Sequence, residues 1–135
     1  MKKQGRKRAI QVGVVGVGRG QSFMRAAEAV GMELVAICDL WEEQLESEGK
    51  MLAVTTYTDY EEFLSHVMDA VVLANFFHQH APFAIKALAS GKHVMSETAA
   101  CHTLAEGVAL IRAVEKSGKT YMLAENYPFM VFNQE

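Results

Sequence analysis

Three glycines follow a short apolar stretch near the start of the chain, in a pattern that suits phosphate binding. Residues 10–16 read Ile-Gln-Val-Gly-Val-Val-Gly, and Gly18 and Gly20 follow at intervals of two. Glycine permits backbone angles that other residues avoid, and its missing side chain lets a pyrophosphate approach the main chain closely. We therefore predict that Gly16, Gly18, Gly20 and the backbone N–H groups near Arg19 hold the pyrophosphate of a nucleotide.

An acidic residue follows roughly 20 residues after the glycines, at the end of a second apolar stretch. This residue, Asp39, comes directly after residues 33–38. In dinucleotide-binding folds, a carboxylate at this position accepts hydrogen bonds from the adenosine ribose. It also repels a 2′-phosphate, and no basic residue stands beside it before Lys50, so the sequence favours NAD over NADP. Arg19 remains within reach of the same region.

Polar residues also stand at the ends of three later apolar stretches. Ligands of open α/β sheets bind outside the carboxyl ends of the strands, so these side chains are expected to face one cleft. We predict that some line the nicotinamide side, that one acidic side chain closes the site, and that the last one contacts the nicotinamide or the substrate. The first group is Asn75, His78 and His80; the others are Glu97 and Asn126. No metal is predicted, because His78 and His80 lack a third ligand at suitable spacing.

The elements that must position these residues are strands and helices, whose patterns alternate along the chain. Apolar runs predict six strands, and 3.6-residue periodicity predicts helices between them. This alternation indicates an α/β fold with a doubly wound parallel sheet, a Rossmann fold with helices on both faces. The predicted strands are residues 9–16, 33–38, 54–57, 69–74, 93–97 and 120–124, and the main helices are 19–30, 41–48, 80–90 and 103–116.

Capping patterns sharpen two of the helix predictions. Thr58 with Glu61, and Thr103 with Glu106, have the spacing of a capping box. The first opens a small helix, and the second opens a longer helix whose predicted buried stripe is Val108, Ile111 and Val114.

Composition indicates one globular domain with no special partner. The chain has 135 residues, of which 50% are hydrophobic and 21% charged, with a formal net charge of −3. This charge gives no field that attracts nucleic acid or an acidic membrane. No apolar run approaches the roughly 18 residues that span a bilayer. Two distant cysteines, Cys38 and Cys101, suit free thiols in a reducing cytoplasm.

The domain limits follow from the same survey. Residues 1–8 carry five basic side chains and are predicted to be a disordered arm, with a nucleic-acid-binding arm as the alternative. Residues 9–124 form the dinucleotide-binding domain. Residues 125–135 are too apolar for a free tail and are predicted to start the connection to a C-terminal substrate domain.

A second class of protein shares the glycine spacing. The pattern G-x-G-x-G also occurs in methyltransferases that use S-adenosylmethionine, and an acid at the position of Asp39 serves both cofactors. Those enzymes usually carry an acidic residue just before the first glycine, where this chain has Val14 and Val15. A methyltransferase domain therefore remains the second hypothesis.

Several stretches together resemble one known family over essentially the whole chain. The chain is similar to the N-terminal half of the glucose–fructose oxidoreductase/inositol dehydrogenase (Gfo/Idh/MocA) family. The resemblance implies a Rossmann domain that binds NAD(P), and a larger second domain that holds substrate and presents a sheet for homo-oligomer formation. It also implies hydride transfer to or from a sugar, polyol or related carbonyl compound. The matching residues are Gly16, Gly18, Asp39, 57–60, His78, His80, 87–94, Glu97, Glu125 and Asn126, and residues 87–97 are the most specific part.

One departure from the family concerns catalysis. Family members commonly follow the glutamate with lysine and proline, whereas this chain has Thr98 and Ala99 after Glu97. Threonine carries no charge and cannot act as a base near neutral pH. The resemblance leaves Glu97 and His80 as candidate catalytic residues, and it leaves a catalytically idle nucleotide-binding sensor as a third hypothesis. The isolated chain is expected to bind dinucleotide weakly and to turn over nothing.

Overall fold

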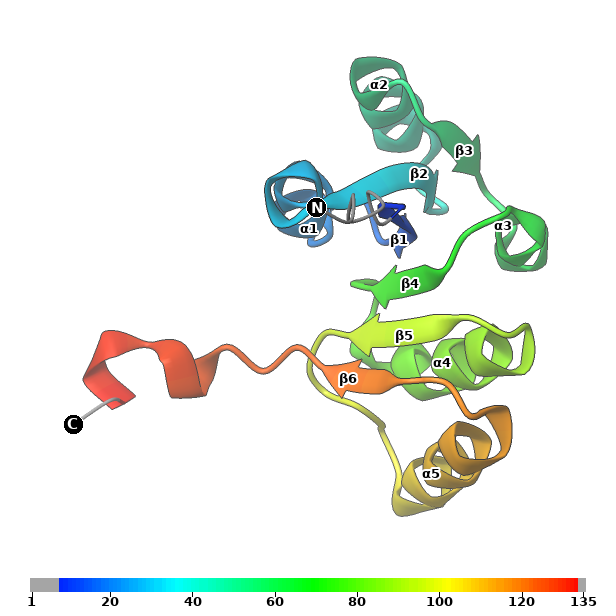
Figure 1. Cartoon of the computed structure of the whole chain (residues 1–135), viewed down its shortest axis with the longest axis vertical. Helices are drawn as coiled ribbons and strands as arrows, with labels where there is room; N and C mark the ends of the chain where they lie inside the picture. Colours follow the sequence, from blue (N-terminus) through cyan, green and yellow to red (C-terminus); the bar gives the residue numbers. More distant parts are fainter. Residues whose placement is uncertain (1–7, 134–135) are drawn as a thin grey trace, which may run out of the picture.

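Six parallel strands form one sheet in the order β3-β2-β1-β4-β5-β6 (Figure 1). The computed structural model describes residues 8–133, so the predicted basic arm falls outside the described residues except for Arg8. The strand order reverses direction after β1, and the six-stranded doubly wound fold is confirmed. The strands are β1 (Ile10–Val15), β2 (Met32–Cys38), β3 (Thr55–Tyr57), β4 (Ala70–Leu73), β5 (His93–Ser96) and β6 (Tyr121–Leu123).

Helices cover both faces of this sheet, and each face has its own core. Val71 and Leu73 of β4 point into a cluster with α3, α4 and α5, while Val72 points into a cluster with α1 and α2. Successive side chains of a strand point to opposite faces, so a strand covered on both sides must be apolar throughout. The helices are α1 (Gln21–Ala26), α2 (Glu42–Leu52), α3 (Tyr60–Ser65), α4 (His80–Ala89) and α5 (Leu104–Ser117).

Strands β1 and β4 lie at the centre of the sheet, where the strand order reverses. Ligands of open α/β sheets bind in the crevice at this point, outside the carboxyl ends of the strands. The loops after β1, β2, β3 and β4 all open at that edge. The carboxyl ends of β1 and β4 therefore lie at this crevice.

The first predicted helix is shorter than the sequence pattern indicated. Instead of a continuous helix over residues 19–30, α1 ends at Ala26 and a 3₁₀ turn follows over Glu28–Val30. The tighter winding of a 3₁₀ turn rotates later residues off the helical face. Val30 is consequently exposed, and Met24 is the buried residue of α1.

Two further helix predictions are corrected by the structure. The cap of α3 is Asp59 rather than Thr58, because the Asp59 carboxylate accepts a hydrogen bond from the Glu62 amide at 2.8 Å. In α5 the capping box of Thr103 is present as predicted, but Val108 and Ile111 are exposed. This helix covers only the edge of the sheet beside α4, so it buries a narrow stripe that includes Leu110.

The chain beyond β6 leaves the sheet. Residues 124–133 run away from the strands and contain two 3₁₀ turns, Tyr127–Phe129 and Val131–Asn133 (Figure 1). Their apolar side chains are mostly exposed. Within residues 8–133, no helix combines the length and the apolar character needed to cross a bilayer.

Candidate functional site

The glycine turn after β1 leaves an open space at one position only. Gly16 has φ +95°, and a Cβ there would lie 2.4 Å from the Ala74 carbonyl oxygen. A Cβ at Gly20 would lie 2.2 Å from the Gly16 carbonyl oxygen. A Cβ at Gly18 would meet nothing within 4 Å. Gly16 and Gly20 thus shape the turn, whereas Gly18 keeps the space above it free for a ligand.

The backbone amides of this turn divide into bonded and free groups. The Gly16 amide donates to the Cys38 carbonyl at 2.9 Å, and the Val17 amide donates to the Asp39 carboxylate at 2.7 Å. The amides of Gly18 and Arg19 have no hydrogen-bond partner among residues 8–133. Two adjacent free N–H groups can therefore donate to a phosphate oxygen.

Asp39 connects the glycine turn to the start of α2. One carboxylate oxygen accepts from Val17, and the other accepts from the Trp41 amide at 2.9 Å. A carboxylate has about four acceptor positions, so capacity for ribose hydroxyls remains on both oxygens. The two backbone bonds fix the carboxylate beside the turn and leave it able to accept from a ligand.

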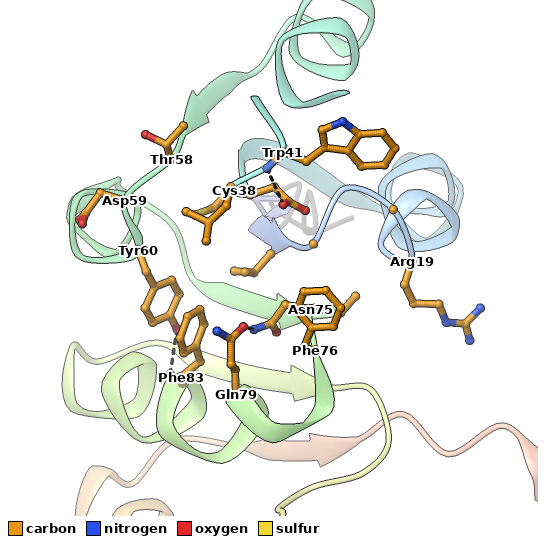
Figure 2. A pocket seen from close by; sticks show the side chains of 16 residues that line it. Arg19, Cys38, Trp41, Thr58, Asp59, Tyr60, Asn75, Phe76, Gln79 and Phe83 are labelled. Carbon is orange, nitrogen blue, oxygen red and sulfur yellow. Dashed lines mark hydrogen bonds between the residues drawn. The ribbon is translucent and has the colours of Figure 1, made fainter. Parts of the chain in front are cut away.

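A cavity of about 760 Å³ opens next to these groups (Figure 2). Its size is within the range of small-molecule and cofactor sites. Gly16, Gly18, Arg19, Asp39 and Asn75 line it, so five of the predicted site residues are brought together. Asn75, predicted for the nicotinamide side, thus shares this cavity with the residues predicted for the pyrophosphate and the ribose. The lining residues that sequence reasoning missed are Val15, Cys38, Leu40, Trp41, Thr58, Asp59, Tyr60, Ala74, Phe76, Gln79 and Phe83.

One end of the cavity is an aromatic wall. The rings of Tyr60 and Phe83 stack with centroids 4.0 Å apart, and the Tyr60 hydroxyl donates to the Phe83 carbonyl at 2.8 Å. Burial raises the pKa of Tyr60. Burial, together with the nearby Asp39 and Asp59 carboxylates, raises the pKa of the Cys38 thiol to about 12. Both side chains therefore stay uncharged near neutral pH.

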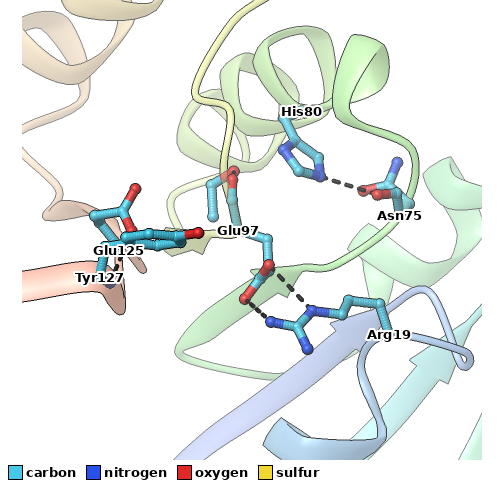
Figure 3. A network of polar contacts seen from close by, with 7 residues as sticks. Arg19, Asn75, His80, Glu97, Glu125 and Tyr127 are labelled. Atoms are coloured by element: carbon cyan, nitrogen blue, oxygen red, sulfur yellow. Dashed lines mark hydrogen bonds and ion pairs between the residues drawn. The ribbon is translucent and has the colours of Figure 1, made fainter. Parts of the chain in front are cut away.

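Arg19 and Glu97 form an ion pair across the mouth of the sheet (Figure 3). The Arg19 Nε donates to one carboxylate oxygen at 3.2 Å and Nη2 donates to the other at 3.1 Å. Both residues also line a smaller cavity of about 290 Å³, together with Asn126. The predicted residues Glu97 and Asn126 thus lie in this second cavity.

The two predicted histidines lie in different environments. His80 is 1% exposed, and its Nδ1 and Nε2 lie 2.8 Å and 3.0 Å from the carbonyl oxygens of Ala99 and Asn75. Both ring nitrogens of His80 therefore contact backbone rather than open space. His78 is exposed, stacks near Phe76, and lines neither cavity.

Two polar features complete the site. The Asn75 amide donates to Gln79 at 3.0 Å, while its Oδ1 is buried and has no partner among residues 8–133. Thr98, at the position of the usual family lysine, is exposed.

In the part of the chain that the structure describes, no three His, Cys, Asp or Glu side chains group as metal ligands.

Comparison with known protein families shows which family this chain belongs to. The family model described as "Oxidoreductase family, NAD-binding Rossmann fold" (Gfo/Idh/MocA) matches residues 10–125. The chain belongs to this family. The resemblance inferred from the sequence is confirmed, and so is NAD as the cofactor that the family description names. The methyltransferase hypothesis is not favoured.

The curated relatives that this chain matches are considerably longer. "Glycosyl hydrolase family 109 protein 1" of Bacteroides fragilis is 32% identical over 136 residues, which cover 91% of this chain and 29% of the relative. A glycosyl hydrolase family 109 protein of a Shewanella strain is 32% identical over 130 residues, covering 87% and 28%. The chain thus spans less than a third of the length of the curated relatives that it matches.

Solved structures of dehydrogenases share the fold. The WlbA dehydrogenase of Bordetella pertussis, in complex with NADH and UDP-GlcNAcA, matches with a TM-score of 0.86 and 26% identity, over 94% of this chain and 40% of that one. The scyllo-inositol dehydrogenase of Lactobacillus casei, with NAD(H) and scyllo-inositol, matches with a TM-score of 0.84 and 22% identity, over 91% and 38%. The second likeness shows the fold alone.

Proposed function

We propose that the larger cavity holds the adenosine half of NAD and that the smaller cavity accepts the nicotinamide half. The open space above Gly18 carries this proposal, since a pyrophosphate there would meet the free amides of Gly18 and Arg19. Asp39 would accept from the ribose hydroxyls, and the wall of Tyr60 and Phe83 is an apolar surface for the adenine end.

On the nicotinamide side, we propose roles for two residues of the smaller cavity and for the two histidines that follow β4. Glu97 and Asn126 line that cavity and would contact the nicotinamide or the substrate. His80 would hold the Asn75 and Ala99 backbone segments in place, because both of its ring nitrogens contact carbonyl oxygens. His78 is exposed on the segment between Asn75 and His80, and its predicted contact with the nicotinamide half stays a proposal.

The whole protein would transfer a hydride between NAD and a sugar, polyol or related carbonyl compound. Bound NAD supplies the hydride acceptor, and the protein supplies position and electrostatics. Thr98 cannot serve as a base near neutral pH, so Glu97 is the candidate proton acceptor that this domain contributes. The similar WlbA dehydrogenase is solved in complex with UDP-GlcNAcA, and the scyllo-inositol dehydrogenase that shares the fold is solved with scyllo-inositol, which supports a hydroxylated ring as substrate.

A glycoside is the second candidate substrate class. The relatives that are 32% identical are named glycosyl hydrolases, and they match this chain over most of its length. A glycoside carries the same ring hydroxyls as a free sugar, so bound NAD would be able to accept a hydride from either compound. Hydrolysis of a glycosidic bond is redox-neutral overall, so in that reaction NADH would have to return the hydride to the sugar.

We also propose the setting in which the whole protein works. Two thiols that form no disulfide suit a reducing cytoplasm. A homo-oligomer would form through the further domain that the family resemblance implies, with no nucleic acid or membrane as partner.

Two experiments test the proposal. Titration calorimetry of the 135-residue chain would compare NAD with S-adenosylmethionine; NAD binding supports the proposal, and binding of S-adenosylmethionine alone would overturn it. The full-length protein would then be assayed for NADH formation with a panel of polyols and sugars, and for hydrolysis of glycosides. Inactivity throughout, with tight NAD binding, would favour the sensor hypothesis.

A further inference from the structure

The guanidinium of Arg19 is turned toward β5 rather than toward the adenosine end of the site. It makes two hydrogen bonds to Glu97, a residue 78 positions later in the chain (Figure 3). The Glu97 side chain is only 14% exposed, so its carboxylate is held among neighbouring groups, while the Arg19 side chain is 59% exposed. In Figure 2 the Arg19 side chain extends away from Tyr60 and Phe83.

The backbone of Arg19 nevertheless lies near the predicted ribose position. Val17, two residues earlier, donates its amide to the Asp39 carboxylate at 2.7 Å. An arginine side chain that starts so close to Asp39 could turn toward a 2′-phosphate on the ribose. Arginine binds phosphate well because its planar group offers several N–H donors.

The charged side chains that line the larger cavity make the orientation of Arg19 important for the choice between NAD and NADP. Arg19 is the only lysine or arginine among the described residues that line the cavity, whereas Asp39 and Asp59 are both acidic. While Arg19 stays paired with Glu97, a 2′-phosphate would meet two carboxylates and no free cation. NAD, which lacks that phosphate, avoids this repulsion.

We infer that Glu97 is a specificity-determining residue for the cofactor, because it holds Arg19 away from the position of a 2′-phosphate. This inference rests on the proposed function, namely that the larger cavity holds the adenosine half of a dinucleotide. Glu97 itself would contact the nicotinamide half of the cofactor. Through Arg19 it would also influence binding at the adenosine half.

The test is a comparison of NAD and NADP binding in four forms of the 135-residue chain. Calorimetry would give the ratio of the two dissociation constants for the unmodified chain, Glu97→Gln, Arg19→Gln and the double variant. Releasing the guanidinium should improve NADP binding relative to NAD by about three- to tenfold in Glu97→Gln. The double variant should show no such gain, since the group that binds the phosphate is gone.

A matched control removes one negative charge elsewhere. Glu115 is exposed on α5, which contributes no described residue to either cavity, so Glu115→Gln should leave the ratio unchanged. Glu97→Asp shortens the side chain by one methylene and should shift the ratio in the same direction as Glu97→Gln. It provides the measurement should Glu97→Gln fold poorly.

The outcomes separate this inference from the proposed function. An equal gain in Glu97→Gln and in the double variant would show that the Glu97 charge acts directly, and would overturn the role of Arg19. NAD binding with an unchanged ratio in Glu97→Gln would overturn this inference alone. Failure of the unmodified chain to bind NAD would overturn the proposed function and this inference with it.

Discussion

Alanine at Gly18 and at Gly16 should separate cofactor binding from folding. The two glycines belong to the same turn, but a Cβ at Gly18 meets nothing within 4 Å, whereas one at Gly16 lies 2.4 Å from a backbone oxygen. Gly18→Ala should therefore fold almost normally, yet its methyl group would occupy the space in which a pyrophosphate approaches. Gly16→Ala should disturb the fold itself.

The size of the folding effect follows from two contributions at Gly16. Its φ of +95° is unfavourable for alanine by about 1–2 kcal/mol, and forcing an extra methyl against backbone costs about 1–3 kcal/mol. The sum is about 2–5 kcal/mol, which lowers the melting temperature of a domain of this length by at least about 6 °C. Gly18→Ala has neither contribution and should change stability by less than about 0.5 kcal/mol.

Thermal unfolding followed by circular dichroism, without NAD, measures the folding effect. Calorimetric titration with NAD measures the binding effect, and Gly18→Ala should weaken affinity at least about tenfold, equivalent to about 1.4 kcal/mol. Destabilisation of Gly18→Ala as large as that of Gly16→Ala would refute the assignment of open space. Unchanged NAD affinity in a folded Gly18→Ala would refute the position of the pyrophosphate.

Three more changes test other parts of the structure. Asp39→Ala leaves two backbone amides without their acceptor and should reduce stability by about 1–3 kcal/mol in urea unfolding, whereas unchanged stability would contradict the two bonds. At about pH 8 a thiol reagent should modify Cys101 rapidly and Cys38 slowly, because burial raises the pKa of Cys38 to about 12; equal rates would contradict this. Hydrogen bonds from the Gln11 amide and from Arg8 lower the pKa of Asp69, so the stability that this carboxylate adds is present above about pH 4 and is lost as pH falls through its folded-state pKa. Asp69→Asn should therefore be less stable than the unmodified chain at neutral pH, with a difference that disappears in strong acid; a difference independent of pH would rule out this linkage.

Much of the fold could be predicted because it depends on local patterns. The strands β1, β2 and β4 are largely apolar on both faces, so their positions are visible in the sequence without knowledge of their neighbours. The helix of Thr103 was predicted from a capping box that involves residues three apart. The helix after Gly20 was predicted too long, because its 3₁₀ turn depends on how the chain enters β2 and not on periodicity.

The candidate site was predictable only in part. Thr58, Asp59 and Tyr60 line the larger cavity because β3 ends directly before them. The rule that ligands bind at the carboxyl ends of strands could have indicated these three residues. The spacing of Thr58 and Glu61 predicts only a helix cap, and the family resemblance of residues 57–60 assigns them no ligand. Phe83 gave no such signal, since it contacts Tyr60 only after α3 and α4 pack on the same face of the sheet.

By itself the sequence determined the approximate positions of the strands and helices, the turn that is open at Gly18, and the acidic residue that follows the second strand. These features depend on residues that are close in the chain, where spacing and side-chain type decide the backbone. Only the tertiary structure decided that Arg19 pairs with Glu97 and that His80 contacts two backbone carbonyls. Partners up to 78 residues apart meet only once the strands take their order in the sheet, and no local pattern specifies that order.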